Sequence, residues 1–285
     1  NANTFQVDQI WVTIDKAPTE ESRGGFHAEF ATGASAQPQG SNNGTSTHTN
    51  NAGGQITGTN DRGTGVPYLY SGYVSYLAPV GNGVQVDLGR LATVLGAEVV
   101  QTNGNFNITQ GAVFGLQPVT YDGVSLSTQI TDEISLTAGV VNDVYSDTDV
   151  SADNNKAYFG QVGYARDTLG LNVGVIYGDS DEGFCTAPAG QQNDCTTSVV
   201  DVVLTLDPTD NISLWLNYDW VHVDGVNQNG GGQSGNGNAH GVAAAGRVGI
   251  TDTLGLATRL EYVNLSNQLG GPVTPNSKNT ELFTV

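Results

Sequence analysis

A short turn pattern that recurs along the chain constrains the fold of this sequence more than any other feature. Four times an Asp, one further residue and then Leu or Ile begin a new alternating segment, in turns that start at residues 131, 166, 209 and 251. Repetition at a nearly fixed period indicates one structural unit used several times. Because Asp can bond the backbone two residues on and form a tight turn, we expect each copy to join the strands of a β-hairpin.

The connections on the other side of each strand pair are long, polar and rich in glycine. They lie at residues 34–66, 143–156, 179–197, 224–239 and 266–278. Short turns at one end of the strands and long loops at the other are typical of an outer-membrane barrel, whereas a soluble β-sandwich does not sort its loops by length. The sequence therefore predicts an all-β fold, a transmembrane antiparallel up-and-down β-barrel, with these long loops on the extracellular side.

Most of the predicted strands alternate apolar and polar residues. In residues 212–220, for example, Leu214 and Leu216 share one face, while Asn217 and Asp219 share the other. One face suits lipid and the other suits water. The predicted strands are 4–15, 24–33, 67–78, 83–92, 119–130, 133–143, 155–166, 169–179, 197–207, 211–223, 239–250, 254–265 and a segment from 280 onward.

The number and direction of these strands predict a larger barrel. Bacterial barrels usually have an even number of strands, and periplasmic termini require the first strand to run outward, yet segment 4–15 runs inward. The segment from residue 280 is too short to cross a bilayer. We therefore expect residues 1–285 to belong to a single barrel domain of about 14 to 18 strands, with strands missing from this sequence at both ends.

Composition and charge agree with a barrel and exclude other classes of protein. No stretch approaches the ~18 apolar residues of a spanning helix, and hydrophobic residues make up only 38% of the chain. A net charge of −19, from 9 Lys and Arg against 28 Asp and Glu, argues against nucleic acid as a partner. The same charge favours cations in anything that passes through the protein.

The two cysteines, Cys185 and Cys195, lie close together inside the loop 179–197. Such spacing in an exposed, polar segment predicts a loop disulfide formed in an oxidising compartment. A metal pair is the weaker interpretation, because no His or further Cys lies nearby in the sequence.

Residues 91–118 interrupt the strand pattern. The segment is too long for a plain hairpin loop, and polar residues and glycines, among them Glu98, break up its apolar pieces. Two interpretations stay open: the segment folds into the lumen and constricts it, or it forms an extracellular hairpin of its own.

Several strand and turn segments resemble the β-barrel porin-2, or OmpL-like, family. They include TFQVDQIWVTI at 4–14, YVSYLAPVGNG at 73–83 and VDLGRLATVLGAE at 86–98. The resemblance implies a porin-like barrel in the bacterial outer membrane, with a strand before the first matching segment and several after the last. It also implies a homo-oligomer, commonly a trimer in porins, and it supplies no catalytic residue.

Motifs for other chemistry are missing from the sequence. The four His residues are scattered, and there is no nucleophile elbow, Walker loop or dinucleotide fingerprint, so we expect neither an enzyme nor a metal site. Acidic runs at 147–153 and 179–182 could bind Ca²⁺ but lack the spacing of an EF-hand, and a solvated surface is the simpler interpretation.

The sequence thus favours a porin, whose water-filled lumen lets small hydrophilic solutes or ions diffuse across the outer membrane with a preference for cations. The alternative is a structural barrel that anchors or sheaths partner proteins. Alternation, together with the interrupting segment, predicts these charged residues along the pore: Glu29, Asp87, Glu98, Asp201, Asp219, Arg247, Arg259 and Glu261.

Overall fold

A computed structural model describes residues 5, 7–33, 46–49, 55–58, 68–145, 155–180, 195–228, 233–266 and 280–284. Thirteen of its strands form one antiparallel sheet in which each strand lies beside its neighbours in the sequence. These strands are β1 (Ile10–Lys16), β2 (Gly24–Thr32), β5 (Tyr68–Ala78), β6 (Val84–Ala92), β7 (Thr120–Gln129), β8 (Ile134–Val141), β9 (Ala157–Arg166), β10 (Leu169–Asp179), β11 (Thr196–Thr209), β12 (Ile212–Gln228), β13 (Gln233–Gly249), β14 (Gly255–Leu265) and β15 (Thr280–Thr284).

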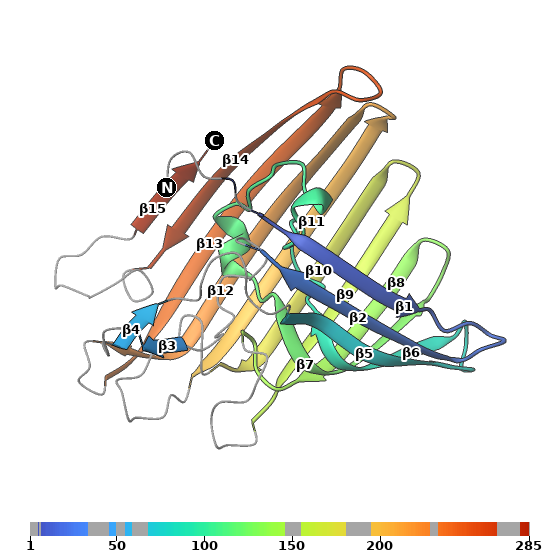
Figure 1. Ribbon diagram of the computed structural model, residues 1–285, viewed down its shortest axis with the longest axis horizontal. Helices are drawn as coiled ribbons and strands as arrows, with labels where there is room; N and C mark the ends of the chain where they lie inside the picture. The colour runs from blue at the N-terminus through green and yellow to red at the C-terminus, as the bar shows by residue number, and fades with distance from the viewer. Residues whose placement is uncertain are drawn as a thin grey trace.

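The sheet curves strongly, so that β1 and β2 come round in front of the strands in the middle of the chain (Figure 1). The strand ends that short turns join lie at one end of the sheet, and the strand ends that longer connections join lie at the other. A separate two-stranded hairpin, β3 (Ser46–Thr49) with β4 (Gln55–Gly58), lies in the connection between β2 and β5. None of the helices among the described residues is long and apolar enough to cross a membrane.

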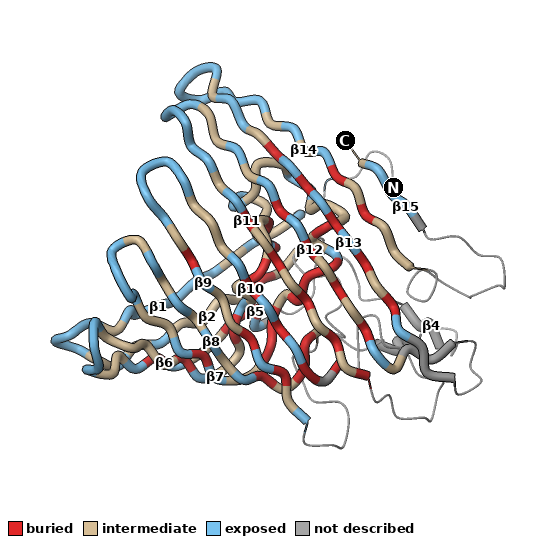
Figure 2. Tube along the Cα trace, turned by 180° about the vertical axis from the view of Figure 1, so that it is seen from behind, coloured by how far each residue is buried: buried red, intermediate tan, exposed pale blue. Residues whose placement is uncertain are grey.

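The two faces of the sheet differ as the alternation predicts. Large apolar side chains on the outer face are exposed, as Leu216 on β12 and Leu260 on β14 show with 44% and 55% of their surface accessible. Polar residues at the alternate positions, such as Asn217 and Glu261, are buried. Buried positions lie from the middle of the strands toward the long-connection end, while the short-turn end is exposed (Figure 2). An apolar outside and a polar inside are what lipid and water require of a barrel wall.

The prediction of an all-β, antiparallel up-and-down sheet is confirmed, and the thirteen predicted segments correspond to the thirteen strands. The prediction of a loop at 224–239 is wrong for most of that range. β12 continues to Gln228 and β13 begins at Gln233, with the backbones still paired at Val226 and Gly235. Because Asn and Gly dominate this region, its composition is that of a loop, whereas extension of a hairpin ladder depends on the partner strand.

Threonine, rather than aspartate, organises two of the repeated turns. The Thr131 hydroxyl accepts from the backbone N–H groups of Glu133 and Ile134, at 3.2 and 3.1 Å. The Thr251 hydroxyl does the same for the corresponding N–H groups of its own turn. The expectation that Asp makes this bond is therefore wrong at these two turns, because the hydroxyl one residue earlier already satisfies both N–H groups. At the second copy, Asp167 adopts φ 51°, a left-handed conformation that Asp tolerates in tight turns.

At the ends of the described sheet, β1 pairs only with β2, and β15 pairs only with β14. The predicted total of 14 to 18 strands stays a prediction. Cys185 and the acidic run at 147–153 lie outside the described residues, as do most of the loops 34–66, 179–197 and 266–278. The disulfide with Cys195 therefore also stays a prediction.

The outer face gives a direct test of membrane insertion. Leu216→Arg places a charge on the outer face of β12, away from the short turn, and should destabilise the folded, lipid-inserted protein by about 2–4 kcal/mol, because lipid cannot solvate the guanidinium. Leu254→Arg makes the same change beside a short turn, where the expected cost is about 0–1 kcal/mol. Denaturant titration of both variants in lipid vesicles measures the difference. Equal losses for the two variants would contradict a lipid-facing surface at Leu216.

Candidate functional site

The connection between β6 and β7 lies on the concave face of the sheet, inside the curve formed by the strands (Figure 1). It contains two short 3₁₀ helices, η1 (Thr102–Gly104) and η2 (Val113–Leu116), and we call residues 93–119 the inner segment. Its side chains Leu95, Val113 and Leu116 are buried. The interruption that the sequence shows at 91–118 is therefore a folded segment packed against the inner wall.

Small residues on the wall make room for the apolar side of the inner segment. A Cβ atom added at Gly241 on β13 would lie 2.7 Å from Leu116 Cδ1 and 3.1 Å from Val113 Cγ2. Ala239 and Ala243, which point the same way from β13, are fully or almost fully buried. Because backbone and helix approach so closely here, a larger side chain at position 241 would displace the helix η2.

Glu261 on β14 holds the beginning of η2. Its carboxylate accepts from the backbone N–H groups of Ala112, at 3.0 Å, and Val113, at 3.1 Å. Arg259, two residues before it on the same face, bridges Glu261 at 3.2 Å and Glu98 of the inner segment at 2.6 Å. Burial raises the pKa of the Glu98 carboxyl, while the hydrogen bond from the Gly111 N–H and the charge of Arg259 act in the opposite direction. The acids and the arginine thus bind the inner segment to β14.

A second set of polar groups joins the inner segment to β11 and β12. The Gln117 amide donates to Asp219 at 2.6 Å and to Asn217 at 2.9 Å, and Asn217 donates to Asp201 at 2.6 Å. The side-chain oxygen of Asn217 also accepts from the backbone N–H of Ala97 at 3.2 Å. Asp201 and Asp219 have no accessible surface. These two acids lie behind the inner segment, away from open solvent.

The opposite side of the inner segment contacts the first strands of the chain. Gln9 donates to the carbonyl of Val100 at 3.0 Å and accepts from the N–H of Thr102 at 3.0 Å. Gln101 donates to Glu29 on β2 at 3.1 Å. The segment is therefore attached to both sides of the curved sheet and spans the space between them.

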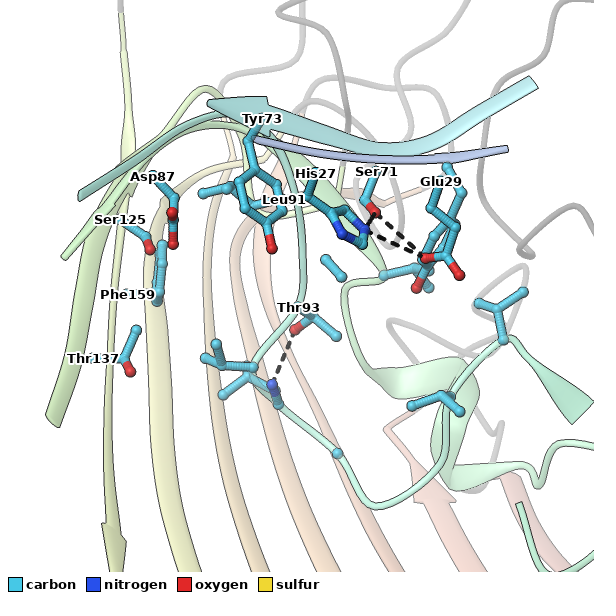
Figure 3. Close-up of a pocket in the computed structure, with 18 of the residues that line it drawn as sticks. His27, Glu29, Ser71, Tyr73, Asp87, Leu91, Thr93, Ser125, Thr137 and Phe159 are labelled. Carbon is cyan, nitrogen blue, oxygen red and sulfur yellow. Dashed lines mark hydrogen bonds and ion pairs between the residues drawn. The ribbon is translucent and has the colours of Figure 1, made fainter. Parts of the chain in front are cut away.

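A cavity of about 410 Å³ remains between the inner segment and the wall formed by β2 and β5 to β8 (Figure 3). Three acids line it: Glu29 from β2, Asp87 from β6 and Glu98 from the inner segment. Between Glu29 and Asp87 in Figure 3 lie the rings of His27 and Tyr73, which stack with their centroids 5.0 Å apart. Hydroxyl groups complete the polar part of the wall, from Ser71, Ser125, Ser127 and Thr137.

Glu98 is paired with Arg259, whereas Glu29 and Asp87 are not matched by Lys or Arg. Glu29 is contacted by Ser71 and Gln101, and His27 approaches it at 3.9 Å. Asp87 accepts from Ser75 at 2.6 Å and from Gln85 at 2.9 Å. Among the described residues, neither acid forms an ion pair with Lys or Arg, so both charges act on the cavity.

The residues predicted along the pore thus fall into three groups. Glu29 and Asp87 lie on the cavity, and Glu98 borders it with its charge paired to Arg259. Four others hold or lie behind the inner segment, namely Asp201, Asp219, Arg259 and Glu261. Arg247 is exposed near the short-turn end of β13, far along the strand from these contacts.

Alternation missed several residues that shape the site. Gln117 lies outside the regular strands, so no period of two indicates where its side chain points. Gln9 lies within the predicted strand 4–15 but just before β1, which begins at Ile10. Tyr73 lies on a predicted strand and on its inner face, but tyrosine is common in strands for reasons of packing alone. Within the described part of the chain, no group of three or more His, Cys, Asp or Glu residues is arranged to hold a metal ion.

A family model described as "Putative beta-barrel porin-2, OmpL-like" matches residues 1–285. The chain belongs to this family. The resemblance seen in the strand and turn segments is thereby confirmed, and the protein is an outer-membrane β-barrel of a porin family, one that is typically not enzymatic. No curated protein matches the sequence significantly.

Three solved structures are similar to this chain at low sequence identity. OmpT of Vibrio cholerae matches with a TM-score of 0.56 and 11% identity, over 92% of this chain and 72% of that one. OpdQ of Pseudomonas aeruginosa matches with a TM-score of 0.42 and 14% identity, over 92% and 60% of the two chains. The outer membrane channel DcaP of Acinetobacter baumannii matches with a TM-score of 0.43 and 9% identity, over 91% and 79%. The match to OmpT supports the barrel fold.

The contact between Glu261 and η2 can be tested without measuring transport. The N–H groups of Ala112 and Val113 bind different oxygens of Glu261, and Glu261→Gln replaces one of these oxygens by an NH₂ group that cannot accept. Amide hydrogen exchange should accelerate about tenfold at whichever of the two residues then faces the NH₂ group, corresponding to roughly 1.4 kcal/mol of lost protection. Glu281→Gln, an exposed change on the neighbouring strand β15, is the control. Unchanged exchange in Glu261→Gln would show that the carboxylate does not hold the inner segment.

Proposed function

We propose that the protein is a passive channel for small hydrophilic solutes or ions, that the inner segment narrows its lumen, and that the passage favours cations. The observation that carries this proposal is the cavity beside the inner segment, where Glu29 and Asp87 lie without a Lys or Arg partner among the described residues. Selectivity then comes from size at the narrowed region and from the field of these two acids.

The distribution of the basic groups supports a cation preference. Arg259 is shared between Glu98 and Glu261, so its charge is balanced within the contact that binds the inner segment. Arg90 pairs with Asp122 at 3.0 Å, at strand positions that share the outer face with Leu88. The uncompensated charge near the cavity is therefore negative. In a narrow space with low-dielectric walls such a charge attracts cations more strongly than it does at an open surface.

Selectivity measurements on two cavity variants test the proposal. Glu29→Gln and Asp87→Asn should each lower the cation-to-anion permeability ratio by about two- to fivefold, since one charge in a partly screened passage contributes about 0.4–1 kcal/mol. The ratio follows from the reversal potential of single channels in a planar bilayer under a salt gradient. Asp132→Asn, which removes a carboxylate from an exposed short turn, should leave the ratio unchanged.

Two outcomes would count against this function. If both cavity variants conduct with the same cation-to-anion permeability ratio as the wild-type protein, Glu29 and Asp87 are excluded as the source of cation preference. Absence of conductance from protein shown to be folded and inserted would favour the second function, a barrel that anchors or sheaths partner proteins. The attachment of the inner segment to both sides of the sheet is the observation compatible with that second function.

The proposal also covers the oligomeric state of the protein and a disulfide bond. Membership of a porin family supports a homo-oligomer, and a trimer is the form we propose. The close spacing of Cys185 and Cys195 supports a disulfide within one extracellular loop. Mass measurement of the detergent-solubilised protein, and of its peptides before and after reduction, examines both points.

A further inference from the structure

Glu29 and Asp87 lie in a fixed order on the cavity wall with the aromatic pair between them. Across the paired strands, Glu29 is opposite Ser71 and His27 is opposite Tyr73. Asp87 is opposite Ser75. Positions 71, 73 and 75 follow one another on the same face of β5, so the wall presents an acid, a stacked pair of rings and a second acid in sequence, as Figure 3 shows. Four residues of β5 separate the rows of the two acids by about 13 Å along the strands, and β2 and β6 lie about 10 Å apart on either side of β5, so the backbone positions of the two acids are about 16 Å apart over the sheet.

The rings between the acids offer an apolar and weakly negative surface. His27 and Tyr73 are nearly parallel, with 21° between their planes. Phe159 from β9 also borders the cavity. Aromatic faces attract cations and pack against methylene groups. A ligand that lies along this wall would therefore meet a carboxylate, then an apolar stretch, then another carboxylate.

Each of the two carboxylates can accept a hydrogen bond from a ligand. Asp87 accepts from Ser75 and Gln85, which occupy three of its roughly four acceptor positions. The contacts of Glu29 with Ser71 and Thr13 are long, at 3.4 Å each, and the shortest, from Gln101, is 3.1 Å. An ammonium group could join these contacts or replace the weakest of them.

We propose that this cavity binds linear amines that carry an ammonium group near each end, the diamines and polyamines, with one ammonium at Glu29 and the other at Asp87. A cavity of about 410 Å³ is too large for a single bare ion and has the size of a small-molecule site. The separation of the acids matches a flexible methylene chain with charged ends, which the rings then cover. This inference rests on the proposed channel, since the lumen is the route by which such a cation reaches the site.

The test uses the full chain folded in detergent, with spermidine as the probe and n-butylamine as the control that has a single ammonium group. Isothermal titration should give spermidine a dissociation constant at least tenfold lower than that of n-butylamine. In a planar bilayer, spermidine should reduce the current at correspondingly lower concentrations. Glu29→Gln and Asp87→Asn should each raise the spermidine dissociation constant about tenfold, while Glu20→Gln, an exposed change in the turn between β1 and β2, should have no effect.

The double variant separates a two-point site from simple attraction by charge. If each acid binds one ammonium, Glu29→Gln with Asp87→Asn should bring spermidine to the level of n-butylamine. Equal affinities of the two amines for the wild-type protein would overturn the inference, as would spermidine binding that survives in the double variant. The titration needs no conductance, so a protein that binds spermidine but does not conduct would reject the channel and keep the site. A cation-selective channel without spermidine binding would reject the site and keep the channel.

Discussion

Backbone hydrogen bonding between neighbouring strands is the constraint on which the rest of this structure depends. Hydrocarbon offers no partner to an N–H or C=O group, so a chain that crosses the membrane as strands has to pair every strand with another. The eleven strands between β1 and β15 meet this demand by pairing on both sides with the strands before and after them in the sheet. Pairing also fixes the period of two, and this period allows the same strand to present leucine to lipid and asparagine to the interior.

The interior imposes a different requirement, because the inner segment has few backbone hydrogen bonds of its own. Its N–H and C=O groups are satisfied by side chains of the wall, among them Glu261, Asn217 and Gln9. Most of the buried acids of the protein therefore have a structural role at the side where the segment is attached. Glu29 and Asp87, on the side of the cavity, are the acids available to act on a solute.

The sequence predicts the strands well because turns and alternation are local properties. It predicts the inner face equally well, since parity alone decides that Asp87 and Asp219 point the same way. It does not predict that Asp219 is covered while Asp87 borders a cavity, because the difference arises from contacts with Gln117, about a hundred residues away along the chain. The sequence also does not predict the threonine turns or the extended β12–β13 ladder. In both cases more than one partner could satisfy the same backbone groups, and composition does not show which partner does so.

The length of β12 and β13 gives the mouth of the barrel an uneven height. Each strand has 17 residues, where a tilted crossing needs only about 9 to 11, and β6 on the other side of the cavity has 9. The extra residues lie at the long-connection end, so the wall extends further there than it does at β6. In the proposed channel, a solute that approaches from this end would meet the longer strands on one side and the shorter strands on the other. Its entrance would be oblique and would open toward the side of the sheet that carries Glu29 and Asp87.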